Sequence, residues 1–223
     1  MSDSSGPGRW FRHRTVTLPT WRTWLLLCVT VLPASLWLLR QSYGWLAVTA
    51  PVADAKYVVV EGWAADGVVK KALAWAQEHD AKIIFTTGIP MDQGQLISPY
   101  PTYAELCAAT LIKLGADPVK VRPAPALKVD AERTRTMAAA LKQVLNTLPI
   151  PAGEKKLNLF TAGAHAYRSR MHFQSVLGPD WQVGVVSVTP PNYMTRGWWR
   201  YSEGVKSVIE ESIAIVGQSL GAP

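Results

Sequence analysis

The sequence predicts an α/β fold: a Rossmann-like, doubly wound, mostly parallel five-stranded sheet with helices on both faces, preceded by one N-terminal transmembrane helix. The first observation is that short apolar runs alternate with segments of helical periodicity after residue 50. The second is that these runs are apolar throughout rather than at every other position, which is typical of strands covered on both faces in a parallel sheet. The third is a long apolar segment with little charge before residue 50.

That N-terminal segment predicts a membrane span. Residues 24–39, WLLLCVTVLPASLWLL, contain no charged side chain, and the apolar length continues beyond Arg40. A spanning helix needs about 20 apolar residues, and tryptophans such as Trp24 and Trp37 are enriched at membrane interfaces. We therefore predict a basic cytoplasmic tail over 1–22, a signal-anchor helix in the lipid bilayer over 23–46, a linker over 47–55 and an exported domain over 56–220.

Charge predicts the orientation of the span. The formal net charge is +7, and residues 1–50 contain five Arg and one Asp. The arginines before the span are Arg9, Arg12, Arg14 and Arg22. By the positive-inside rule, the N-terminus stays in the cytoplasm, which predicts a single-pass protein of the cytoplasmic (inner) membrane with a periplasmic or extracytoplasmic domain. Because this charge lies on a tail rather than on a patch of the domain, nucleic-acid binding is not expected.

A cleaved signal peptide is the competing interpretation of the same segment. Its candidate cleavage site is Val48-Thr49-Ala50, but Pro51 follows at once and disfavours cleavage. Cys28 lies in the predicted span and Cys107 in the domain, so no disulfide is expected between them. We favour the uncleaved anchor.

The elements of the domain follow in order along the chain. Apolar, β-branched runs predict strands over 57–60, 82–88, 119–125, 157–163 and 183–189. Apolar residues three and four positions apart predict helices over 66–79, 102–114, 130–148, 167–177 and 202–220. The loop before the last helix contains Trp198 and Trp199, which are compatible with a ligand lid or a membrane contact, although packing ranks first.

Known catalytic and binding motifs are absent from the sequence. There is no GxGxxG dinucleotide fingerprint and no GxxxxGK[ST] phosphate loop, which disfavours ordinary NAD enzymes and P-loop NTPases. No GxSxG follows a predicted strand, as a nucleophile elbow requires, and the four histidines are not spaced as a metal cage. No metal site is predicted, and the sequence identifies neither a cofactor nor a protein partner.

The fold itself predicts where a ligand binds, because ligands of doubly wound sheets lie at the carboxyl ends of the strands. The candidate ligand-binding residues there are Glu61, Gly62, Trp63, Gly88, Arg133, Thr134 and Arg168, and the candidate catalytic residues are His165 and Glu105.

His165 and Arg168 share one face at the start of a predicted helix, where free backbone N–H groups attract an anion. This predicts a phosphate or carboxylate held by Arg168, with His165 as acid or base. The alternative is that His165 caps the helix and Arg168 makes a surface ion pair, as we expect of Arg170 and His172. Glu105 has an equally plain alternative, since Thr102 and Glu105 match a capping box.

After the first strand, the sequence has a strand that ends in Thr-Gly, an acidic residue in the next helix, a helix start with Thr, and a His-x-x-Arg pair after the fourth strand. In this order, these features resemble the ElyC/SanA/YdcF family of bacterial envelope proteins over residues 56–213. The resemblance carries onto Gly88, Glu105, Thr134 with Ala138, His165, Arg168 and Glu210. Two departures indicate a divergent member: Glu61-Gly62-Trp63 replaces a Gly-rich turn, and Arg133-Thr134-Arg135-Thr136-Met137-Ala138 replaces Asn-Thr-x-Glu-Asn-Ala. The family is linked to envelope integrity and to peptidoglycan and lipid-carrier metabolism, and one cytosolic relative binds S-adenosylmethionine.

Three functions remain open at this stage. The first is an anchored envelope protein that binds a phosphate- or carboxylate-bearing metabolite, such as a polyprenyl phosphate or a peptidoglycan precursor, as a hydrolase or transferase. The second is a non-catalytic scaffold that recruits envelope-assembly partners. The third is a binder of S-adenosylmethionine or another nucleotide-type ligand, which export disfavours because such ligands are scarce outside the cytoplasm.

Overall fold

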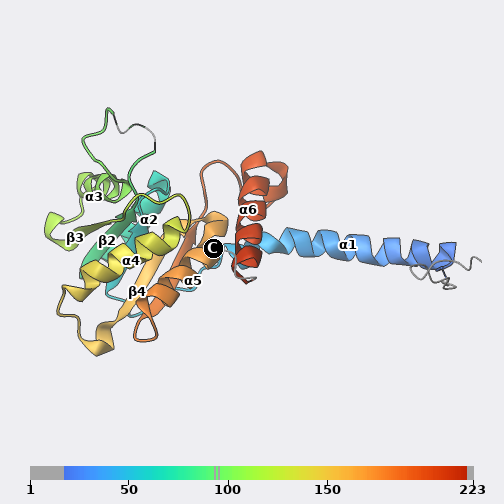
Figure 1. The fold of residues 1–223 in the computed structure, drawn as a ribbon, viewed down its shortest axis with the longest axis horizontal. Helices are drawn as coiled ribbons and strands as arrows, with labels where there is room; N and C mark the ends of the chain where they lie inside the picture. Colours follow the sequence, from blue (N-terminus) through green and yellow to red (C-terminus); the bar gives the residue numbers. More distant parts are fainter. Residues whose placement is uncertain (1–17, 93, 95, 220–223) are drawn as a thin grey trace, which may run out of the picture. The chain divides into compact units, whose positions relative to one another are not determined.

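Five parallel strands form a single sheet in the computed structural model, which describes residues 18–92, 94 and 96–219 (Figure 1). The strands are β1 (Tyr57–Glu61), β2 (Ile83–Gly88), β3 (Val121–Pro125), β4 (Lys156–Ala162) and β5 (Gln182–Val188). Their order is β3-β2-β1-β4-β5, and each neighbouring pair is parallel. The predicted fold class is confirmed, with a sheet that is wholly parallel.

Helices cover both faces of this sheet (Figure 1). The helices of the domain are α2 (Asp66–Glu78), α3 (Tyr103–Lys113), α4 (Arg133–Asn146), α5 (Ala166–Leu177) and α6 (Ser202–Ser219). Helices α2 and α3 pack on one face of the sheet, where Val58 and Val60 of β1 point. Helices α4 and α5 pack on the other face, where Val59 of β1 points. Every residue of β1 is buried, which explains its continuous apolar sequence.

The element boundaries agree closely with those expected from the sequence, and the largest difference lies at the start of α4. The helix begins at Arg133 rather than at residue 130. Glu132, the residue before it, has a left-handed backbone with φ of 53°. A helix cannot continue through that conformation, so residues 130–132 remain outside it.

Helix α1 (Trp21–Leu46) is long and apolar enough to cross a membrane. Its bounds match the predicted span over 23–46, whereas residues 1–17 of the predicted basic tail, with Arg9, Arg12 and Arg14, lie outside the described residues. The chain divides into two compact units, residues 1–39 and 40–223. The last turns of α1 therefore belong to the same unit as the α/β domain.

Those last turns form a small core with the segment that precedes α6. Tyr43 and Leu46 are buried together with Ala164, Tyr193 and Trp198. The rings of Tyr43 and Tyr193 meet edge to face with centroids 5.8 Å apart. Trp198 is only 3% exposed, so the packing role ranked first for it is confirmed.

The segment predicted as a linker, 47–55, is bound along the edge of the sheet. Ala50 and Val185 exchange two backbone hydrogen bonds, with N···O distances of 2.8 and 3.1 Å. The side-chain amide of Asn158 accepts from the backbone N–H of Val52 and donates to its carbonyl. The connection from α1 to β1 is thus part of the folded domain.

Candidate functional site

A cavity opens at the point where the strand order reverses. Strands β1 and β4 are neighbours, but the chain leaves β1 toward α2 on one face and leaves β4 toward α5 on the other. Their carboxyl ends therefore diverge into a crevice of the kind that holds ligands in this fold. The cavity has a volume of about 740 Å³, and α6 closes one side of it. Its lining includes Trp63, Arg133, Thr134, His165, Arg168 and Glu211.

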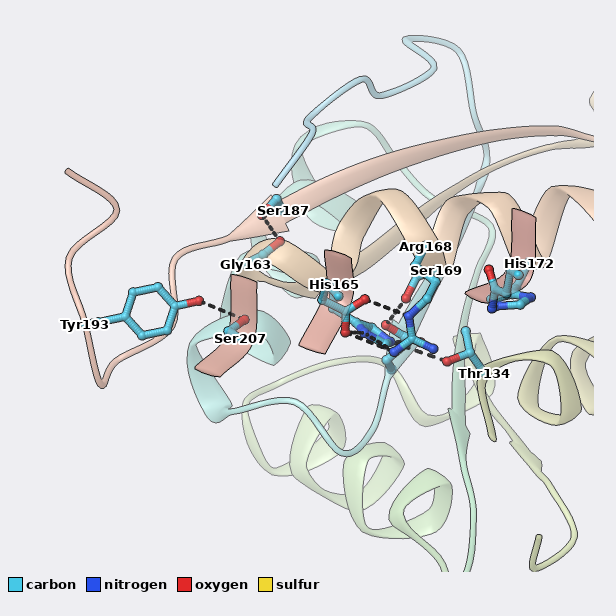
Figure 2. Close-up of polar contacts among 12 residues, drawn as sticks. Thr134, Gly163, His165, Arg168, Ser169, His172, Ser187, Tyr193 and Ser207 are labelled. Atoms are coloured by element: carbon cyan, nitrogen blue, oxygen red, sulfur yellow. Dashed lines mark hydrogen bonds and ion pairs between the residues drawn. The ribbon is translucent and has the colours of Figure 1, made fainter. Parts of the chain in front are cut away.

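His165 lies at the centre of the polar contacts in this cavity (Figure 2). It ends η3 (Gly163–His165), a short turn that connects β4 directly to α5. Its Nδ1 lies 2.6 Å from Oε1 of Glu211, a residue of α6. Nδ1 also lies 3.1 Å from Nη2 of Arg168, which can only donate, but the 2.6 Å contact to the carboxylate is the shorter of the two. Because a carboxylate can only accept, we assign the proton of this shorter hydrogen bond to Nδ1. This tautomer leaves Nε2 with a free lone pair.

Arg168 holds the same carboxylate from a second direction. Its Nε lies 2.6 Å from Oε2 of Glu211, and its Nη2 lies 2.9 Å from Oε1, which makes a bidentate pair. Burial alone would raise the pKa of Glu211, but hydrogen bonds from Arg168 and His165 outweigh it and lower the pKa from 4.5 to about 2. Glu211 is therefore ionised at neutral pH. Arg168 binds an internal carboxylate with two of its nitrogens, which corrects the expectation that its fork is free for a ligand anion.

Three of the predicted residues surround the opposite edge of the His165 ring. Thr134 Oγ1 lies 3.4 Å from Nε2, and Glu61 Oε1 lies 3.8 Å from it. Trp63 meets the imidazole edge to face, with ring centroids 5.0 Å apart. Glu61 is fully buried; its Oε2 accepts from Ser169, while Oε1 has no hydrogen-bond partner among the described residues. The structure thus brings Glu61 and Trp63 close to His165, as the strand-end argument predicted, together with Thr134, to which the family resemblance pointed.

Glu105 is not part of this group. Its Oε2 accepts from the backbone N–H and the hydroxyl of Thr102, at 3.1 and 2.8 Å, and the two residues form a complete capping box at the start of α3. The carboxylate that orients His165 is Glu211 instead. The helix-capping role, which was the alternative interpretation of Glu105, therefore accounts for its contacts. A glutamate three positions after the N-cap residue is close enough to hydrogen-bond to it directly.

Gly88 and Gly62 serve close packing at the strand ends. A Cβ at Gly88 would lie 2.4 Å from the backbone nitrogen of Ala104, and a Cβ at Gly62 would lie 2.4 Å from the carbonyl oxygen of Tyr103. Neither distance is possible for a side chain, so both glycines let the ends of β1 and β2 approach the start of α3. Their structural role explains them without a ligand.

The start of α4 forms another wall of the cavity. No side chain caps this helix, and its first residues, Arg133 and Thr134, line the cavity. Uncapped N–H groups and the positive end of the helix dipole favour an anion there. Arg133 reinforces that wall, although its Nη1 also lies 3.6 Å from Asp92.

Glu211 is the functional residue that the sequence interpretation missed by one position. The family resemblance pointed to Glu210, which is exposed on the cavity rim with its Oε1 4.0 Å from Nζ of Lys206. The signal that separates them is periodicity: Gly204, Val208 and Glu211 are the buried positions along the first turns of α6. A glutamate on the inward face of an amphipathic helix needs a buried partner, and a glutamate one position earlier does not.

Among the described residues, no three His, Cys, Asp or Glu side chains are placed to hold a metal ion. No protein-family model matches the sequence, and a search of curated proteins finds no match. The site therefore has to be interpreted from its own geometry: an oriented histidine, its ionised partner and an anion-favouring helix start around one cavity.

Proposed function

We propose that this chain is a membrane-anchored cell-envelope protein whose α/β domain binds a phosphate- or carboxylate-bearing envelope metabolite and acts on it as a hydrolase or transferase. The observation that carries the proposal is the 2.6 Å contact between His165 Nδ1 and Glu211, which leaves Nε2 at the cavity. The resemblance to the ElyC/SanA/YdcF family supports the envelope setting and makes a polyprenyl phosphate or a peptidoglycan precursor the first ligands to test.

His165 is suited to acid–base chemistry by its contacts. A ring nitrogen bonded to a carboxylate fixes both the tautomer and the plane of the imidazole, and the other nitrogen then accepts a proton from the reacting group. Its side chain is 12% exposed, so the ring is shielded from bulk water but still faces the cavity. General acid–base catalysis of this kind contributes about 10²- to 10⁴-fold in rate.

The charge of the cavity restricts the ligand. The helix start with Arg133 favours one anionic group, but several carboxylates line the cavity as well: Asp92, Asp130, Glu132, Glu203 and Glu210. These carboxylates repel further negative charge. We therefore expect a ligand with its charge concentrated in one head group near Thr134 and with neutral, polar or apolar groups elsewhere.

The test uses the full chain in detergent micelles, with polyprenyl monophosphate and polyprenyl diphosphate as substrates. We expect release of inorganic phosphate from at least one of them, and a fall of about 10²-fold or more in the His165→Ala variant. Arg170→Ala is the matched control, because Arg170 lies on the same helix but donates to the backbone carbonyl of Val183. Equal rates in wild type and His165→Ala would remove the catalytic claim.

The scaffold alternative predicts the opposite pattern. A scaffold would bind its partner through the same cleft or through the Trp198–Trp199 loop. In that loop Trp198 is buried, and the guanidinium of Arg40 lies over the ring of Trp199, 5.1 Å from its centroid. Of the pair, Trp199 is therefore the side chain that a partner could reach, since it is 38% exposed. Binding of both lipids without any turnover would favour this alternative over catalysis.

A further inference from the structure

We propose that Thr134 is the nucleophile of the site, in a Thr134–His165–Glu211 triad. This inference rests on the proposed acid–base role of His165. The three side chains come from α4, η3 and α6, and they form one continuous line of contacts, from Thr134 Oγ1 to His165 Nε2 at 3.4 Å and from His165 Nδ1 to Glu211 Oε1 at 2.6 Å. A hydroxyl, a base within reach of it and an acid that orients the base are the parts of a nucleophilic triad.

The assignment of each role follows from the proton positions. Glu211 is ionised and also bound by Arg168, so it holds the Nδ1 proton of His165. Nε2 is then the acceptor, and the nearest described hydroxyl is that of Thr134. A 3.4 Å separation is long for a hydrogen bond, but such contacts are often loose without substrate and tighten when it binds.

Three other hydroxyls at or near the cavity are engaged elsewhere. Ser207 lines the cavity but interacts with the hydroxyl of Tyr193, at 3.4 Å. Thr136, one half-turn beyond Thr134, donates to the carbonyl oxygen of Glu132. Ser169 donates to Glu61. Of the described hydroxyls, that of Thr134 is the one in contact with the His165 ring.

The surroundings of Thr134 favour negative charge on the attacked group. Thr134 is the second residue of α4, whose start has no side-chain cap. The positive end of this helix therefore faces the charge that grows on the ligand during attack. Glu61, fully buried with an unpartnered Oε1 3.8 Å from Nε2, places a second carboxylate beside the ring that becomes positively charged. Glu61 is thus a positioning residue that acts through His165.

The reaction on a phosphate ester then has two balanced steps. Thr134 Oγ1 forms a bond to phosphorus while the bond from phosphorus to the leaving oxygen breaks, and the hydroxyl proton passes through His165 Nε2 to that oxygen. Water next attacks the phosphorylated threonine and gives one proton to His165. The bond from Oγ1 to phosphorus breaks, His165 returns the proton to Thr134, and inorganic phosphate leaves.

An alkyl fluorophosphonate probe tests the nucleophile directly on the full chain in detergent. The oxygen of an activated hydroxyl replaces fluoride on phosphorus, and hydrogen fluoride leaves, so intact mass and peptide mapping report the labelled residue. We expect the label on Thr134, with the labelling rate reduced at least about 10²-fold in Thr134→Val and His165→Asn, as for loss of an acid–base partner. Thr134→Ser keeps a hydroxyl and should still label. Thr136→Val, the matched control, should label at the wild-type rate.

Three results would overturn the triad without touching the proposed function. A label on His165 would make the imidazole itself the nucleophile. A wild-type chain unlabelled at Thr134, or phosphate release that persists in Thr134→Val, would assign the attack to water. Failure of the proposed function is seen separately, as phosphate release that does not depend on His165. Melting curves of both Thr134 variants guard against misfolding, and Thr134→Ser keeps the test valid if Thr134→Val is unstable.

Discussion

Glu211 is the residue on which the candidate site depends most, since among the described residues it is the carboxylate that hydrogen-bonds to both His165 and Arg168. We expect Glu211→Gln to lower the free energy of unfolding by about 3 kcal/mol at neutral pH, as measured for broken buried ion pairs. Phosphate release should fall as well, because the amide no longer fixes the charge and tautomer of His165. Glu210→Gln is the control: its carboxylate is exposed, and its pair with Lys206 is worth under about 1 kcal/mol.

Wild type and Glu211→Gln should differ in how their free energy of unfolding depends on pH. The pKa of Glu211 is lowered from 4.5 to about 2 because the hydrogen bonds from Arg168 and His165 outweigh its burial. A carboxyl with a depressed pKa stabilises the fold above its ordinary pKa, and this contribution disappears as the pH falls from about 4.5 toward 2. Denaturation at pH 6 and pH 2.5 should show an acid loss of up to about 3 kcal/mol in wild type that Glu211→Gln lacks. An equal loss in both proteins would contradict the assignment.

Residues near strand ends could be predicted from the sequence, and residues far along the chain could not. The proximity of His165, Glu61 and Trp63 could be predicted because the fold class places every strand end at one edge of the sheet. Thr134 was proposed from the family resemblance instead. Glu211 approaches His165 from 46 positions away, through a helix whose placement depends on packing after β5. No local sequence pattern predicts the contact between Glu211 and His165. The pattern around Glu105 is local, and it corresponds to a helix cap.

At the scale of elements, η3 combines a left-handed backbone with close packing at Gly163. Gly163 has φ of 50°, and a Cβ there would lie 2.7 Å from the hydroxyl oxygen of Tyr193 and 2.9 Å from that of Tyr43. We expect Gly163→Ala to destabilise the protein by about 2 kcal/mol or more, from left-handed strain of about 1–2 kcal/mol plus the clash. It should also slow phosphate release, because the turn carries His165.

Gly153→Ala is the control for that variant, since no atom lies within 4 Å of the added carbon. Its free energy of unfolding should stay within about 0.5 kcal/mol of wild type. Thermal or urea denaturation of the three proteins gives the comparison. Equal stability of Gly163→Ala and Gly153→Ala would mean that the turn tolerates a side chain.

Helices and strands were predictable because each carries its own periodicity, and the start of α4 shows where that information ends. Apolar spacing indicated a helix from residue 130, but the left-handed backbone of Glu132 delays it to Arg133. A single residue with positive φ leaves no trace in hydrophobic spacing. The delay matters for function, because it leaves the helix start uncapped at the cavity.

At the scale of the whole molecule, the orientation of the chain in a membrane is the main open prediction. Helix α1 is long and apolar enough to span a bilayer, and the arginines that precede residue 23 predict a cytoplasmic N-terminus. Alkaline phosphatase fused after Pro223 in a bacterial host should then be active, because that enzyme folds only after export. A green fluorescent protein fused at the same position should stay dark. The reverse pair of results would place the domain in the cytoplasm and favour a nucleotide-type ligand.

The way Tyr43 and Leu46 are buried bears on how the protein matures. A processing peptidase that cut after Ala50 would remove both side chains from the core that they share with Ala164 and Trp198. It would also cut next to the residue that pairs with Val185. The released fragment would expose an apolar surface next to the turn that carries His165. Cleavage there would thus remove part of the folded core, whereas the uncleaved chain keeps that core intact.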